Sequence, residues 1–272
     1  MPDIQILSPR QTFEDNMRPA HLLLRVYRLL DSNDTIASDG DMVTSLRSVV
    51  QATAGEELLL IYNELFLGLV RERAQMHIAT FKQKSLCHLL RQSVVASCTA
   101  LDTYLPALLR TNLPIRIRIL GRTFLRPGDE SIKQQFKDLS FDLDEVLRLL
   151  DDPNAAEYLS TRILSQTNFS YLSSKRGIHV TAALLGVSAP WEALATHLGR
   201  DKKELSDTLE QTTSRRNDII HRADRKQTDP GGDAQDITYA WAKHAVDTIE
   251  NICLALDELV KTQVEELSKA VE

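Results

Sequence analysis

Hydrophobic residues recur at helical spacing along most of the first half of the chain. In "RPAHLLLRVYRLLDS" (18–32), leucines and a valine stand three and four residues apart, with Pro19 in the first turn. The same spacing predicts helices in "DMVTSLRSVVQAT" (41–53) and "EELLLIYNELFLGLVRERAQMHI" (56–78). A longer helix is predicted for "KSLCHLLRQSVVASCTALDTYLPALLR" (84–110), bent or ended by Pro106.

Residues 111–139 break this pattern, because "NLPIRIRILGRTFLRPGDES" is rich in arginine and carries the Gly and Pro residues of a loop. One short strand is expected at Ile115–Ile119, where isoleucine and arginine alternate. Helical patterns return in four segments: 141–152, 153–169, 177–187 and one that begins at Pro190 and Trp191. A last helix is expected from about Asp236 to the end of the sequence.

A further helix is expected in "DKKELSDTLEQTTSRRNDIIHR" (201–222), where Asp201 and Glu204 have the spacing of a capping box. With helix predicted almost throughout, the expected fold class is all-α, a helical bundle. The aromatic residues Phe169, Tyr171 and Trp191 are expected in its core rather than as stacking platforms for bases.

Composition narrows the class of protein. The chain has 272 residues, 43% of them hydrophobic and 26% charged, which is typical of a globular protein of one or two domains. The apolar runs are too short or too interrupted to cross a bilayer, so no membrane is expected. Its three cysteines, Cys87, Cys98 and Cys253, stand in apolar helical contexts, which favours a reducing, cytoplasmic location.

The segment "RRNDIIHRAD" (215–224) carries the residues best suited to chemistry. Arginine offers a planar, permanently charged fork for phosphate oxygens, and histidine exchanges protons near neutral pH. Arg216 and His221 would therefore suffice for RNA cleavage, in which the substrate supplies its own nucleophile, the 2′-hydroxyl. Such a site needs no metal and no cofactor, and the sequence shows neither HExxH nor CxxC.

Helix geometry limits how these residues can meet. At about 100° per residue, Arg216 and His221 point about 140° apart on one helix, whereas Asn217 and His221 share a face. Arginine and histidine could converge if the helix ended near His221, or if two copies of the segment faced each other across a two-fold axis. Spacing alone is weak evidence, since Arg71 and His77 in "RERAQMH" fit the same loose pattern.

Taken together, these residues resemble the Arg-x4-6-His motif of the HEPN superfamily (higher eukaryotes and prokaryotes nucleotide-binding), in its Arg-Asn-x-x-x-His form. "RQSVVASCTALDTYLPALL" is similar to the first helix of the RiboL-PSP-HEPN branch, with Asp102 before Tyr104 and Leu105. The resemblance predicts two parts of the chain, a helical extension at 1–80 and a HEPN-like helical domain at 81–272.

The resemblance implies a metal-independent endoribonuclease that acts as a homodimer on RNA and leaves 2′,3′-cyclic phosphate ends. By position, His221 would be the general acid and base, and Arg216 the group that stabilises phosphate charge. Asn217 would hold the polar geometry, and Asp102 would orient Arg216 or His221. The resemblance also implies toxin–antitoxin or antiviral (anti-phage) defence, with an antitoxin or regulatory protein as partner. An acid beside the motif, Asp218, departs from this pattern; it either pairs with Arg222 or repels phosphate.

Basic residues around the motif predict an RNA-binding surface, because arginine is well suited to phosphate contacts. They lie in the arginine-rich segment and at the end of the motif helix: Arg116, Arg118, Arg122, Arg126, Arg215, Arg222, Arg225 and Lys226.

Simpler interpretations stay open for these residues. His221 also fits a helix-terminal histidine favoured by the helix dipole, and Arg216 fits a surface ion pair. Asp102 also fits a surface carboxylate, and the arginine-rich segment a solvated face. At the level of the whole protein, the alternatives are a non-catalytic HEPN-like module that binds RNA or nucleotides, and a helical interaction protein.

Overall fold

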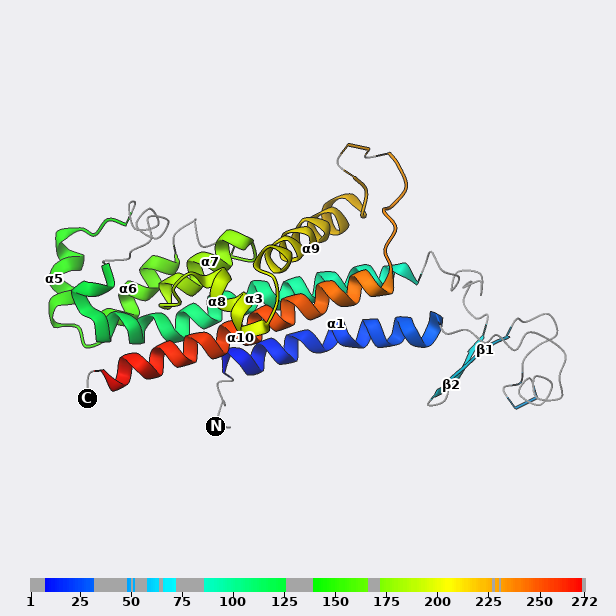
Figure 1. Cartoon of the computed structure of the whole chain (residues 1–272), viewed down its shortest axis with the longest axis horizontal. Helices are drawn as coiled ribbons and strands as arrows, with labels where there is room; N and C mark the ends of the chain where they lie inside the picture. The colour runs from blue at the N-terminus through cyan, green and yellow to red at the C-terminus, as the bar shows by residue number, and fades with distance from the viewer. Residues whose placement is uncertain are drawn as a thin grey trace.

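The computed structural model describes residues 8–31, 48–49, 51, 58–63, 66–71, 86–125, 139–165, 172–226, 228–229 and 231–270. It confirms the all-α class. Three long helices lie side by side: α1 (Pro9–Asp31), α3 (Cys87–Leu120) and α10 (Tyr239–Lys269) (Figure 1). The shorter helices α6 (Ala155–Leu164), α7 (Lys175–Leu184), α8 (Pro190–Leu198) and α9 (Lys202–Arg222) pack around them, and α5 (Leu143–Asp151) packs against α6.

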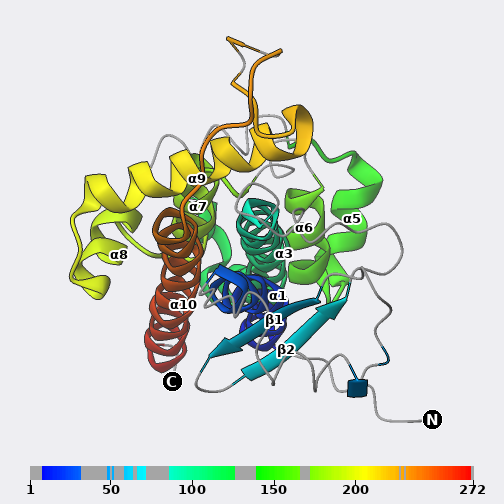
Figure 2. The ribbon, with the colours of Figure 1, turned by 90° about the vertical axis from the view of Figure 1, so that its right-hand side faces the viewer.

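The core centres on α3, which contacts α1, α10, α6, α9 and α7. Its leucines at 90, 101, 105, 109 and 113 are fully buried. Tyr104 is also buried, and its hydroxyl donates to the Cys253 carbonyl oxygen at 3.0 Å and to Asp257 Oδ1 at 3.2 Å, which fixes α3 to α10. Figure 2 shows α9 above α3 and α1 below it, so α3 separates the two.

Helix α1 begins at Pro9, ten residues before the predicted first turn, and contains Pro19 in its interior. The predicted start of this helix was wrong because its apolar stripe begins before the leucine-rich stretch on which the prediction was based. Phe13, Met17, Ala20, Leu24 and Tyr27 repeat at three and four residues, and all are buried in the same core as α3. The predicted division of the chain at residue 80 stays a prediction.

The helix predicted for 56–78 is wrong over the described part of that range. Leu58–Asn63 (β1) and Phe66–Arg71 (β2) form an antiparallel hairpin, with Leu58 opposite Arg71 and Asn63 opposite Phe66. A short apolar run that is rich in leucine, with single aromatic and β-branched residues, fits either a strand or a buried helix, so periodicity did not decide between them. The helix predicted at 41–53 falls almost entirely outside the described residues.

Helix α3 runs without interruption through Pro106 and Pro114 to Leu120 and continues as a 3-10 turn, η2 (Gly121–Leu125). The predicted helix end, the irregular start of 111–139 and the strand at Ile115–Ile119 are therefore wrong. Proline removes a helical hydrogen bond, but burial of Leu108, Leu113 and Ile117 offsets that loss. Residues 126–138 lie outside the described residues.

The helices predicted in the second half are confirmed, with ends within a few residues of the expected ones. Asp142 and Glu145 form a reciprocal capping box at α5. Ser174 caps α7, and Asp201 caps α9 by accepting from the Glu204 N–H. None of the helices in the described part of the chain combines the length and the apolar character that a membrane crossing requires.

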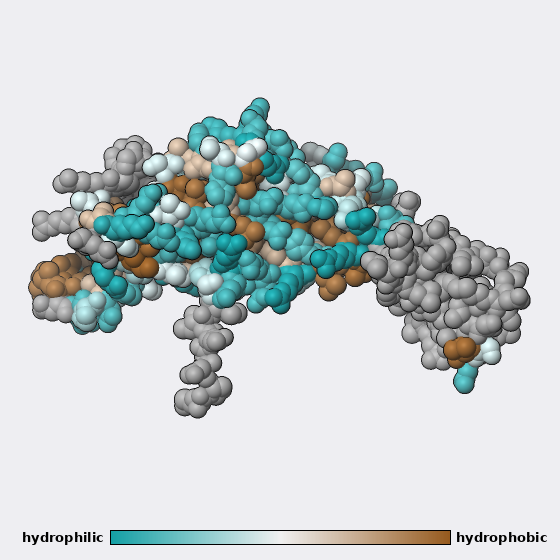
Figure 3. All heavy atoms as spheres, turned by 60° about the horizontal axis from the view of Figure 1, so that its bottom comes forward, coloured by the Kyte–Doolittle hydropathy of each residue, from teal (hydrophilic) through white to brown (hydrophobic). Residues whose placement is uncertain are grey.

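Helix α5 presents an apolar face to solvent. Leu143, Val146, Leu147 and Leu150 are each 42–73% exposed and stand at positions i, i+3, i+4 and i+7, which share one face of a helix. Figure 3 shows hydrophobic residues gathered at the end of the molecule where α5 lies in Figure 1. This face is the most apolar exposed feature of the described helices.

Candidate functional site

The candidate motif lies in the last two turns of α9, and Arg216 to His221 are all helical. The helix ends at Arg222, and the next two residues, Ala223 and Asp224, have positive φ angles of 50° and 64°. The Asp224 N–H donates to the Asp218 carbonyl oxygen at 2.9 Å, which closes the helix end. The helix therefore does not end early enough to turn Arg216 toward His221.

Arg216 lies against α3. Its guanidinium donates to the Asp102 carboxylate and, at 3.1 Å, to Asn217 Oδ1. The Arg216 side chain is 20% exposed, whereas that of Asp102 is 37% exposed. The predicted group of Arg216, Asn217 and Asp102 is thus brought together, with Asp102 orienting the arginine.

The inner side of Arg216 meets the Cys98 thiol. Burial raises the pKa of Cys98 to about 12, and the neighbouring Arg216 opposes that rise. Arg216 Nε is buried and has no hydrogen-bond partner among the described residues. The guanidinium is therefore fixed by two of its three nitrogens.

His221 lies on the other side of α9 and is exposed. Its ring forms no hydrogen bond or ion pair with any described residue. One copy of the chain leaves the imidazole separate from the Arg216–Asp102 pair, as the 140° divergence predicts. The neighbouring Asp218 pairs with Arg222 four residues on, so its carboxylate is engaged within the helix.

A buried ion cluster, which the sequence pattern did not predict, holds the end of α9. Asp224 is fully buried and accepts from Arg91 Nε of α3 at 2.6 Å and from Arg215 Nε at 2.6 Å. Arg215 Nη2 also donates to Asp224 Oδ2 and to the carbonyl oxygens of Gln235 and Asp236. The cluster joins the residues on both sides of the motif to each other and to α3.

Arg215 therefore does not fit the predicted RNA-binding role. Its side chain is 15% exposed, its Nε and Nη2 are occupied by hydrogen bonds, and its guanidinium lies 5.1 Å from the Trp241 ring centre. The signal that could have shown this is the acid nine residues on, Asp224, at the start of a loop that returns to the bundle. Without the fold, that acid does not show whether it pairs with Arg215 or with Arg216.

The other predicted RNA-binding residues differ in availability. Arg116 is half-buried, with its guanidinium so close to Gly186 that an added Cβ would meet it, and burial lowers the pKa of that guanidinium. Arg118 pairs with Glu157 on the surface. Arg126 and the side chain of Arg122 lie outside the described residues.

Beyond α9, the predicted basic flank is mixed with acids. Arg225 Nε donates to the Gly232 carbonyl oxygen at 2.8 Å. Lys226 is exposed, but it lines a pocket with the three aspartates Asp229, Asp233 and Asp236. The field around this loop is therefore less basic than the sequence suggested.

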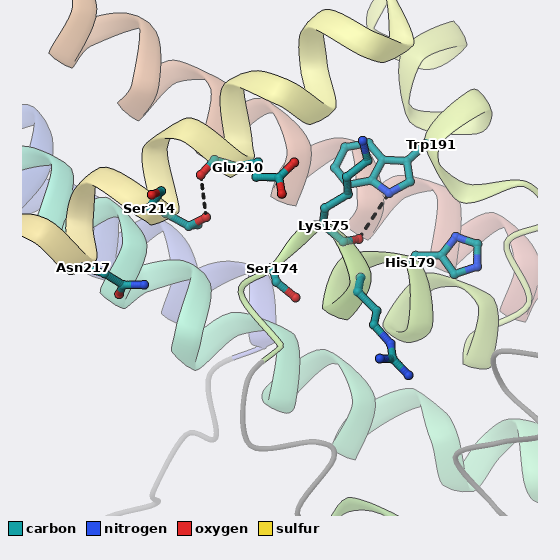
Figure 4. A pocket seen from close by; sticks show the side chains of 9 residues that line it. Ser174, Lys175, His179, Trp191, Glu210, Ser214 and Asn217 are labelled. Carbon is teal, nitrogen blue, oxygen red and sulfur yellow. Dashed lines mark hydrogen bonds between the residues drawn. The ribbon is translucent and has the colours of Figure 1, made fainter. Parts of the chain in front are cut away.

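A second pocket, of about 620 Å³, lies beside the motif between α7, the start of α8 and α9. Asn217 and Ser214 of α9 form one side of it, and Lys175, Arg176 and His179 of α7 belong to the other. Figure 4 shows Asn217 and Ser214 on α9, opposite His179 on α7. The motif thus opens into a hollow with basic side chains.

Two further observations bear on the chemistry. Within the described residues, no group of three or more His, Cys, Asp or Glu side chains is arranged to hold a metal ion. Comparison of the chain with protein-family models, with curated proteins and with solved structures gave no match. The residues and their geometry are therefore the basis for the function proposed below.

Proposed function

We propose that this protein is a metal-independent endoribonuclease of HEPN type that acts as a homodimer. The observation that carries the proposal is the fixed Arg216, held by Asp102 from a different helix and by Asn217, together with an exposed His221 on the other side of the same helix. A phosphate-binding cation and a proton-transferring ring are the two groups that RNA cleavage by the 2′-hydroxyl requires.

In the proposed reaction, the 2′-oxygen attacks the neighbouring phosphorus and the bond from phosphorus to the 5′-oxygen breaks. His221 accepts the 2′-hydroxyl proton, and a protonated imidazole delivers a proton to the departing 5′-oxygen. Arg216 stabilises the negative charge that builds on the phosphate oxygens. The products are a 2′,3′-cyclic phosphate and a 5′-hydroxyl end.

The divergence of Arg216 and His221 on a helix that stays regular through Arg222 supports a dimer. A two-fold axis beside the end of α9 would place Arg216 of one protomer near His221 of the other. It would form two such composite sites, each with one Arg216 and one His221 from different protomers. A strict monomer in light scattering at the concentrations used for cleavage would contradict this part of the proposal.

The test is cleavage of total RNA in EDTA by the wild-type protein and by His221→Ala. We expect cleavage without metal, cyclic phosphate ends, and activity lost in the variant by about 10²–10⁴-fold. Replacement of His244, an exposed histidine of α10, is the matched control and should leave cleavage unchanged. Equal cleavage by wild type and His221→Ala would show that the site is wrong.

A non-catalytic RNA-binding module is the second candidate, and the internal ion pair of Arg216 with Asp102 favours it because the pair already satisfies the arginine charge. The same experiment separates the two, since the module would retain RNA without cleaving it. A helical interaction protein would do neither.

The cellular role is proposed from the family resemblance. Cys87, Cys98 and Cys253 are free thiols, which supports a reducing compartment such as the cytoplasm. A toxin or anti-phage effector would arrest growth when expressed alone in bacteria, and an antitoxin or regulatory protein would restrain it. Growth arrest by wild type but not by His221→Ala is the expected result.

A further inference from the structure

The strongest unassigned feature is the pocket of about 620 Å³ between α7 and α9. This pocket lies beside the candidate site and is not part of it, because Asn217 is the one candidate site residue that also lines the pocket. Figure 4 shows its two sides, with Ser174 between Asn217 and His179.

Helix α9 connects this pocket to His221. Glu210, Ser214, Asn217 and His221 repeat at three and four residues, so all four lie within about 60° of one another around the helix axis. The first three line the pocket, and His221 follows Asn217 by one turn, about 6 Å along the axis. A chain bound in the pocket can therefore continue along one face of α9 to the imidazole.

The α7 side of the pocket is cationic. Lys175 and Arg176 stand in the first turn of α7, which contains no acidic residue. Arg176 is exposed and forms no hydrogen bond or ion pair with any described residue, and Lys175 Nζ lies 3.8 Å from Asp207. The acid in the lining, Glu210, stands two turns from Asn217, at the end of the stripe remote from His221.

The pocket is better suited to a backbone than to a stacked base. Trp191 is only 6% exposed, and its Nε1 donates to the Lys175 carbonyl oxygen at 3.3 Å, so little of the ring is open to a ligand. The hydroxyl groups of Ser174 and Ser214 and the amide of Asn217 offer polar contacts between the cations and the motif.

We infer that this pocket is a subsite for single-stranded RNA, which holds a backbone phosphate other than the scissile one through Lys175 and Arg176. The inference rests on the proposed function, because it treats His221 as the point of cleavage. The ligand chemistry is that of a phosphodiester chain with ribose hydroxyls, read without base preference.

The test compares Lys175→Gln/Arg176→Gln with Arg18→Gln/Lys261→Gln, which removes two charges from exposed residues of α1 and α10 that do not line the pocket. In a His221→Ala background, binding of a fluorescent 12-nucleotide RNA is measured by anisotropy over a range of salt concentrations. In the wild-type background, cleavage of the 12-mer and of a dinucleotide is measured. Thermal unfolding checks that each variant is folded.

We expect the pocket variant to weaken 12-mer binding by about 10-fold or more and to lower the salt slope by about 0.7 for each lost phosphate contact. Its kcat/KM should fall for the 12-mer and stay unchanged for the dinucleotide, which is too short to reach the pocket. The control variant should match the parent protein.

The two proposals fail in different ways. If the wild type cleaves RNA but the pocket variant binds the 12-mer as the control does, the subsite is wrong and the nuclease stands. If the wild type cleaves neither substrate but the pocket variant loses affinity, the nuclease is wrong and the RNA-binding pocket stands. Equal loss on both substrates would also overturn the subsite.

Discussion

The two faces of α9 differ in what their side chains do. On the face toward α3, Arg215 and Arg216 are paired with acids and Ile219 is buried. On the opposite face, Ser214 and Asn217 line a pocket and His221 is exposed. The inner face holds the helix in place, whereas the outer face carries groups that remain available to a ligand.

The comparison shows that neighbouring arginines can have different roles. Arg215 is enclosed by Asp224 and two backbone carbonyl oxygens, whereas Arg216 is held by a partly exposed carboxylate that a phosphate could displace. Because the two differ by one position, about 100° around the helix, charge in the sequence does not separate anchoring from function.

The largest effect is expected from replacing Arg216 or His221, the two proposed catalytic residues, which lie on opposite faces of α9. Arg216→Ala and His221→Ala should each lower kcat by about 10²–10⁴-fold. A heterodimer of the two variants, purified with two different tags, should recover about half of the wild-type activity, because one of its two composite sites is intact. Co-expressed tagged chains provide this heterodimer, and RNA cleavage is the measurement.

The homodimers of each variant, purified in the same way, are the controls and should stay inactive. If the heterodimer is as inactive as they are, Arg216 and His221 do not act across the two protomers.

The next effect concerns the inner face alone. Asp224→Asn removes the carboxylate between Arg91 and Arg215 and leaves two guanidinium groups in a buried place. We expect the free energy of unfolding to fall by about 3–5 kcal/mol, because an uncompensated buried charge is costly. Urea unfolding measures the change.

Asp233→Asn, at an exposed loop acid, is the matched control and should shift stability by less than about 0.5 kcal/mol. A loss as small as this at Asp224 would mean that the cluster does not anchor α9.

The sequence predicted the fold class, most of the second-half helices and the motif, since these depend on local periodicity and on short capping patterns. It did not predict the continuation of α3 through Pro106 and Pro114, because tertiary burial compensates for the lost hydrogen bonds. Nor did it predict the ion cluster around Asp224, since Arg91 is more than a hundred positions from Asp224 and meets it only in the folded bundle. Long-range pairing of charges was the part that local patterns could not supply.

A smaller effect is expected from Asp102, the α3 residue that holds Arg216 on the inner face of α9. Asp102→Asn keeps the shape of the side chain but weakens its hold on Arg216. A hydrogen bond to a charged group contributes about 1.5–3 kcal/mol, so cleavage should fall by about 10–100-fold. Since the pair is partly exposed, stability should change by about 1 kcal/mol or less.

Single-turnover cleavage and urea unfolding give the two quantities for Asp102→Asn. Asp144→Asn, on exposed α5, is the control. Unchanged cleavage would return Asp102 to the role of a surface carboxylate.

The smallest effect tests the turn that follows His221. Ala223 has a φ of 50°, a conformation that costs a residue with a side chain about 1 kcal/mol relative to glycine. Ala223→Gly should therefore raise the free energy of unfolding by up to about 1 kcal/mol. Ala240→Gly, at an exposed right-handed position in the first turn of α10, should lower it by less than about 0.5 kcal/mol. Because the substitution is the same at both positions, changes of opposite sign in the free energy of unfolding would assign the gain at Ala223 to its left-handed backbone. A loss of stability at both positions would show that this turn is not strained.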